Sequence, residues 1–156
     1  MDNIVIMIPF CRTPEEVDGV LAAMAENGLV RGEKGLQVYL MAEVPANVFQ
    51  AENFAARCDG FSIGSNDLTQ LMLGISRDSE ALSPFFNEMD RSVTTAIEQL
   101  IDAAHKAGIK IGICGQGPSD KPDFAEFLVT QGVDSMSLNP DSVVKTLERV
   151  AELECR

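Results

Sequence analysis

Three side chains that could take part in chemistry each follow a short apolar run in this chain. They are Glu43, Asp67 and Cys114. If the apolar runs are parallel strands, their carboxyl ends meet at one edge of a sheet and these side chains lie there together. The sequence therefore indicates one site that contains two carboxylates and a thiol.

The residue types suggest what such a site could hold. Two carboxylates suit Mg²⁺, which usually takes one or two protein carboxylates and fills its other positions with substrate and water oxygens. Gly64, Ser65 and Asn66 precede Asp67 and offer backbone and side-chain donors for an anionic oxygen. A thiol, with an ordinary pKa of about 8.5, can exchange a proton near neutral pH. We interpret the cluster as a site for a cation, an anion and a proton donor.

Each of these residues also has a more ordinary interpretation. A carboxylate after a strand is often a helix cap or a surface group, and a glycine with small polar residues is often only a turn. A cysteine at a strand end is usually an inert, small apolar side chain. We expect that inert role for the other three cysteines, Cys11, Cys58 and Cys155.

The composition limits the class of protein. The chain has 156 residues, of which 46% are hydrophobic and 23% charged, which fits one globular domain. The net charge of −12 argues against nucleic acid or an anionic membrane as a partner, because both require basic surface. Without an apolar stretch of about 18 residues or a basic leader, we expect a cytoplasmic protein with reduced cysteines.

The chain alternates between strand and helix patterns five times. Strands are expected over 4–9, 36–42, 61–63, 109–114 and 136–138, and helices over about 14–26, 47–57, 88–107 and 122–131, with a helical turn over 68–73 and a last helix that Asn139 would cap. Repeated β-α units predict a parallel α/β sheet with right-handed crossovers. An open, doubly wound sheet and part of a (β/α)8 barrel both remain possible. In either layout Asn139 would also lie at the carboxyl edge.

Four segments resemble the C-terminal domain that binds phosphoenolpyruvate (PEP) or pyruvate in the family of PEP-utilising enzymes. They are 41–45, 60–70, 114–119 and 134–141, and they occur in the family's order. The motif Cys114-Gly-Gln resembles the synthase branch more than the dikinase branch, which has Cys-Gly-Glu. The resemblance implies that residues 1–156 are a single domain comprising about five of the eight β/α units of a TIM-type barrel, its C-terminal part.

The resemblance also implies a function and roles for the residues. PEP synthases transfer a phosphoryl group from a phosphohistidine to the enolate of pyruvate, with overall conversion of ATP, pyruvate and water to AMP, PEP and phosphate. Glu43 and Asp67 would bind Mg²⁺ and, with Gly64, Ser65 and Asn66, the substrate. Cys114 would be the catalytic acid that protonates the enolate carbon in one direction and removes a methyl proton in the other.

The family's phosphohistidine and nucleotide-binding domains and its early barrel strands with substrate-binding arginines have no counterpart here. His105 matches no phosphorylation motif, and Arg12 follows the first strand, where it could face an anion. We therefore expect those domains as partners, an isolated chain that is inactive and self-associates, and weak binding of Mg²⁺ with oxalate. The alternatives are an enzyme like pyruvate phosphate dikinase, a magnesium-dependent carbon-carbon lyase of the same superfamily, and a truncated binding module without turnover.

Overall fold

The computed structural model describes residues 4–76 and 78–155. Its centre is a parallel sheet of β1 (Val5–Ile8), β2 (Gln37–Ala42), β3 (Gly60–Gly64), β4 (Lys110–Cys114) and β5 (Ser135–Met136). The helices are α1 (Pro14–Glu26), α2 (Pro45–Phe49), α3 (Ala51–Ala55), α4 (Ser65–Leu73), α5 (Arg91–Ala107), α6 (Gly117–Asp120), α7 (Pro122–Gln131) and α8 (Val143–Glu154). Short 3-10 turns are η1 (Glu33–Gly35), η2 (Ser83–Phe85) and η3 (Pro140–Ser142).

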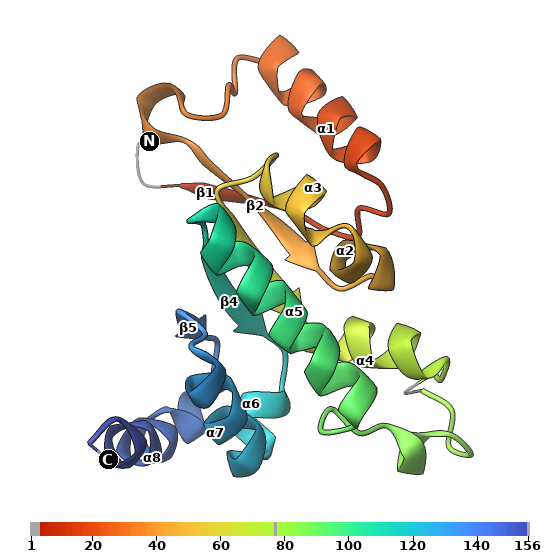
Figure 1. The fold of residues 1–156 in the computed structure, drawn as a ribbon, viewed down its shortest axis with the longest axis vertical. Helices are drawn as coiled ribbons and strands as arrows, with labels where there is room; N and C mark the ends of the chain where they lie inside the picture. The colour runs from red at the N-terminus through yellow and green to blue at the C-terminus, as the bar shows by residue number, and fades with distance from the viewer. Residues whose placement is uncertain (1–3, 77, 156) are drawn as a thin grey trace.

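The order of the strands decides between the two layouts left open by the sequence. Each strand pairs with the next one along the chain, in the order β1-β2-β3-β4-β5, and all pairs are parallel. In a doubly wound sheet the order of the strands reverses at a switch point, and in this sheet it does not. In Figure 1 the strands follow one side of the molecule and α1, α3 and α5 follow the other, as in an arc of a barrel.

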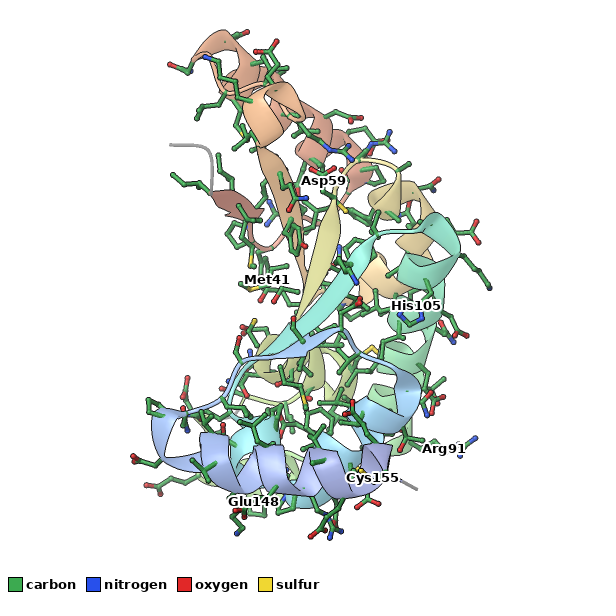
Figure 2. All side chains as sticks on the ribbon, turned by 90° about the vertical axis from the view of Figure 1, so that its left-hand side faces the viewer. Met41, Asp59, Arg91, His105, Glu148 and Cys155 are labelled. Atoms are coloured by element: carbon green, nitrogen blue, oxygen red, sulfur yellow. The ribbon has the colours of Figure 1, made fainter. Side chains whose placement is uncertain are left out.

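Alternation along the strands separates a helix-covered face from an open face. In β2 the side chains of Val38, Leu40 and Ala42 are buried, while those between them are more exposed. In β4, Ile111 and Ile113 are buried in the same way. The buried side chains pack with α1, α3, α5 and α7 into one core, which includes Val17, Phe54, Ile97, Leu100 and Phe124. This core fixes the strands, and Figure 2 shows Met41 toward the open face and His105 on the helical side.

Several boundaries differ from the sequence-based expectations. The helix expected over 47–57 is two short helices, and α4 begins at Ser65 rather than at residue 68. Helix α5 starts at Arg91 because Asp90 caps it, with Oδ1 accepting from Ser92 N at 2.9 Å. Asn139 stands at the N-cap of η3, which runs directly into α8, but its side chain makes no capping hydrogen bond, and α8 itself begins only at Val143. Thr13 caps α1, with Glu16 N donating to Oγ1 at 3.3 Å.

Within the described part of the chain, no helix is both long and apolar enough to cross a membrane.

Candidate active site

Glu43 lies directly after β2 and is buried, with 3% of its surface exposed. Phe10 N donates to its Oε1 at 2.9 Å, and Phe10 has a positive φ of 54°, so the loop after β1 bends to reach this carboxylate. Asn47 fixes the same turn from α2: its Oδ1 accepts from Glu43 N at 3.1 Å and from Val44 N at 2.9 Å, while its Nδ2 donates to Cys11 O at 2.9 Å. The loop after β1 therefore holds the Glu43 carboxylate, and Asn47 of α2 holds the backbone of the same residue.

The charge of Glu43 is poorly compensated. Burial raises the pKa of this carboxyl, the negative charge of Asp67 raises it further, and the hydrogen bond from Phe10 N opposes both effects. Among residues 4–76 and 78–155 no basic side chain pairs with Glu43. A cation bound between the two carboxylates would relieve this cost, because it favours their charged forms.

Gly64 brings the end of β3 against Glu43. A Cβ at residue 64 would lie 2.6 Å from Glu43 Oε2, so a side chain here would displace the carboxylate. The chain passes from Gly64 straight into α4, and Ser65, Asn66 and Asp67 form its first turn. The first backbone N–H groups of a helix have no acceptor within the helix, and they favour an anion at that end. The residues expected to form a plain turn thus form a helix N-terminus beside a buried carboxylate.

Cys114 ends β4 opposite Gly64 in the strand register. It alternates with buried Ile113, which places it on the open face of the sheet, and it is half-buried. Its Sγ lies 3.4 Å from Ile63 O, to which it can donate. The other three cysteines differ. Burial raises the pKa of Cys11 and raises that of Cys58 to about 12. Cys155 is exposed and follows the last helix. Only Cys114 joins the site among them.

The structure brings most of the expected residues to one edge but not Arg12. Its guanidinium pairs with Glu16 at 2.8 Å on the exposed side of α1, so the structure does not support an anion-binding role. Asn139 follows β5 as expected, where its N–H donates to Ser119 Oγ at 2.9 Å. That bond connects α6 to the segment after β5.

Two residues that support the site, Asn47 and Glu88, are not among the site residues expected from the sequence. Glu88 is 3% exposed and its Oε1 accepts from Ser65 Oγ at 2.9 Å. Asn47 could have been found, because it stands three residues after Val44, where a side chain can bond back to a helix start. Glu88 carries no such local signal, because its partner is 23 residues away.

The donor set fits a magnesium ion that shares its coordination with substrate. Both candidate ligands are oxygen donors, and the described residues include no group of three or more His, Cys, Asp or Glu that could hold a metal ion alone. Mg²⁺ commonly uses one or two carboxylates and keeps other positions for water and substrate. Glu43 Oε2, which touches the space that a side chain at Gly64 would fill, receives no hydrogen bond from the described residues. It is the oxygen best placed to bind a cation.

Comparison with known proteins identifies the family. The model of the PEP-utilising enzyme, PEP-binding domain matches residues 1–155. The chain belongs to this family. Two similar relatives are the phosphoenolpyruvate synthases of Aquifex aeolicus and Escherichia coli K12, which are 57% and 50% identical over 154 residues each. Those residues are 99% of this chain but 18% and 19% of the relatives, so the chain spans about a fifth of their length.

Solved structures confirm the barrel-type fold of this PEP-binding domain. A HpcH/HpaI aldolase/citrate lyase family protein from Burkholderia cenocepacia aligns with a TM-score of 0.64 at 19% identity, over 97% of this chain and 65% of that one. A citrate lyase from Burkholderia xenovorans aligns with a TM-score of 0.63 at 19% identity, over 96% and 48% respectively. At this identity the likeness concerns the fold alone. The expected arc of a TIM-type barrel is thus confirmed.

Proposed function

We propose that this chain forms the pyruvate- and PEP-binding catalytic portion of a phosphoenolpyruvate synthase. The observation that carries the proposal is the convergence of Glu43, the first turn of α4 and Cys114 on one edge of the sheet. The identity of 57% to a synthase over nearly the whole chain supports the branch of the family.

Each group has a distinct task in this proposal. Glu43 and Asp67 would hold Mg²⁺, which supplies positive charge for the negative oxygen that develops on pyruvate. Ser65 and Asn66, in the first turn of α4, direct N–H groups toward the substrate carboxylate. Gly64 leaves room for this approach, because any side chain there would occupy the place of the Glu43 carboxylate.

Cys114 moves the proton at the substrate's methyl carbon. In the direction of PEP synthesis the thiolate takes a methyl proton, and the enolate oxygen then accepts the phosphoryl group from a phosphohistidine. In the reverse direction the thiol gives its proton to the enolate carbon. The position of Cys114 on the open face, half-buried and 3.4 Å from Ile63 O, keeps its sulfur fixed without sealing it from a ligand.

The phosphohistidine and nucleotide-binding domains of a complete synthase are partners in this proposal. The edge strand β1 supports the proposal that more protein packs against this chain. Apolar side chains in and beside β1 are 40 to 47% exposed; they are those of Ile4, Val5, Met7 and Phe10. In a closed barrel a neighbouring strand would cover them. We expect the separate chain to self-associate, which light scattering would show; a monodisperse monomer would contradict this.

The other candidate functions have less support. The aldolase and lyase relatives share the fold at 19% identity, which does not extend to their chemistry. Cys114-Gly-Gln favours a synthase over a dikinase-like enzyme, and a binding module without turnover has no need of a thiol on the open face.

The test replaces the matching segment of the Aquifex aeolicus synthase with this chain and follows exchange of pyruvate methyl protons with D₂O by NMR. Changing Cys114→Ala in that chimera is expected to slow exchange by about 10²–10⁴-fold, the usual contribution of a general acid-base group. Phosphohistidine formation from ATP should persist. Cys155→Ala is the matched control and should exchange at the parent rate; exchange unaffected by Cys114→Ala would refute the role.

A further inference from the structure

Glu88 is a buried carboxylate just before α5, and the proposed mechanism does not use it. Its side chain is 4% exposed and lies between the first turn of α4 and the start of α6. Oε1 accepts from Ser65 Oγ at 2.9 Å, and Oε2 lies 3.4 Å from Lys121 Nζ. Burying a carboxylate is costly unless it is bonded or paired, and these two contacts offset that cost.

The loop that follows Cys114 rests directly on this pair of side chains. A Cβ at Gly115 would lie 2.5 Å from Ser65 Oγ, and one at Gly117 would lie 2.5 Å from Glu88 Oε1. Gly115 also has a φ of +123°, which disfavours any side chain. The backbone on the carboxyl side of Cys114 therefore packs against Ser65 and Glu88 without intervening side chains.

We propose that Glu88 is a positioning residue that holds the loop after Cys114 against the first turn of α4. Through Ser65 it fixes the turn that carries Asp67, and through its contact with Gly117 it supports the segment that follows Cys114. The Cys114 thiol is thereby held at a fixed position relative to the carboxylates of Glu43 and Asp67. The catalytic value of this position rests on the proposed function, whereas the positioning itself does not.

Two features indicate that Glu88 acts through its hydrogen bond to Ser65 rather than through its ion pair with Lys121. Lys121 is 38% exposed, and an ion pair with a partner that accessible contributes little. The hydrogen bond to Ser65 is buried on both sides, since Ser65 is fully buried. We therefore assign the positioning to the Ser65 bond, and Glu88→Gln, which keeps an acceptor of the same size, should preserve it.

The experiment places a nitrile probe on Cys114 by cyanylation of the full chain. Cys155→Ser removes the exposed thiol, while Cys11 and Cys58 are buried and should not react. The infrared nitrile band then reports the surroundings of residue 114, and the alkylation rate of the free thiol with iodoacetamide reports its access. Thermal melting of each variant reports fold stability separately.

We expect Glu88→Ala to shift the nitrile band toward that of a fully solvated thiocyanate and to raise the alkylation rate about fivefold, the factor that loss of one typical hydrogen bond corresponds to. Glu88→Gln and Lys121→Met should keep the parent band. Glu80→Ala, at an exposed glutamate of the same connection, is the matched control and should change neither readout.

If Glu88→Ala fails to fold, Ser65→Ala tests the same bond from its other side and should give the same band shift. A folded Glu88→Ala or Ser65→Ala with the parent band and the parent alkylation rate would overturn the proposal. Titration of the Aquifex aeolicus synthase chimera with Mg²⁺ and oxalate separates the two claims. A band shift in the Glu88→Ala chain together with absent oxalate binding by the chimera would support positioning and count against the proposed function alone.

Discussion

Carboxylates stand at both ends of the sheet, and their surroundings differ. At the amino end, Asp59 precedes β3 and Asp134 precedes β5, and each accepts the backbone N–H of a neighbouring strand, from Val38 at 2.8 Å and from Ile111 at 2.9 Å. Arg31 pairs with Asp59 at 2.8 Å, and Lys110 pairs with Asp134. Figure 2 shows Asp59 at the upper end of the strands.

At the carboxyl end, Glu43 has a hydrogen bond from Phe10 N and a nearby negative charge on Asp67, but no cationic partner among the described residues. The pKa shifts have opposite signs. Burial raises the pKa of Glu43, whereas the hydrogen bond from Lys110 lowers that of Asp134. Burial raises the pKa of Asp59, but the hydrogen bonds from Arg31 and Val38 lower it by more, so the pKa is lowered overall.

The difference separates carboxylates that connect parts of the fold from a carboxylate that we propose binds a ligand. A paired carboxylate at the amino end of a barrel strand connects neighbouring elements, whereas the carboxyl end is where barrel proteins bind substrates. We therefore expect opposite changes in stability when the charge is removed at the two ends.

The largest expected effect is at the amino end. Changing Asp59→Asn and Asp134→Asn together should lower the free energy of unfolding by about 1–3 kcal/mol for each site, because the charge-assisted hydrogen bonds are lost. Urea denaturation measures this, and Asp102→Asn, at an exposed aspartate of α5, is the control. A double variant as stable as the parent would contradict the claim that the carboxylates at the amino end stabilise the fold.

The same two aspartates set a pH dependence. Because their folded pKa values are lowered, the stability that they contribute is present above the ordinary pKa of an aspartate and is lost as the pH falls through the folded values. The parent chain should therefore lose stability as the pH falls below about 4. The double variant should show a flatter profile in urea titrations at stepped pH.

A smaller effect of opposite sign is expected at Glu43. Glu43→Gln keeps an acceptor for Phe10 N and removes a buried charge, so the metal-free chain should gain on the order of 1 kcal/mol in unfolding free energy at neutral pH. The gain should shrink at acid pH, since a group with a raised pKa becomes protonated there and no longer carries the cost. Destabilisation by Glu43→Gln at pH 7 would show that Glu43 is structural.

The smallest effect is expected for Lys110→Met. Lys110 is 70% exposed, and an ion pair of this kind contributes at most about 1 kcal/mol. The backbone N–H of Ile111 still bonds Asp134 in the variant, so the urea midpoint should change little. A large loss would mean that the ion pair, rather than the backbone bond, holds the amino end.

The sequence predicted the sheet and the strand-end residues because their signals are local. Apolar runs and turn residues mark β2, β3 and β4, and Glu43, Asp67 and Cys114 lie at or just after the ends of these strands. The barrel layout was not decided by those patterns, since strand order depends on which strands pair across long sequence separations.

The supporting residues were harder to predict. Glu88 meets Ser65 across 23 residues of a mixed-charge connection, and its neighbours in sequence do not indicate burial. The start of α4 at Ser65 was missed because small polar residues after Gly64 favour turns as readily as a first helical turn. Such contacts follow from the packing of loops, which no local pattern encodes.

The most direct test of the central claim is the stabilisation of the chain by Mg²⁺ with oxalate, a mimic of the pyruvate enolate, measured as a shift in the urea midpoint. The parent chain should be stabilised in proportion to ligand saturation, and Asp59→Asn should keep the same shift from its lower starting point. Glu43→Gln and Asp67→Asn should lose it. A Glu43→Gln chain stabilised as strongly as the parent would contradict the claim that the unpaired carboxylates at the carboxyl end form the ligand site.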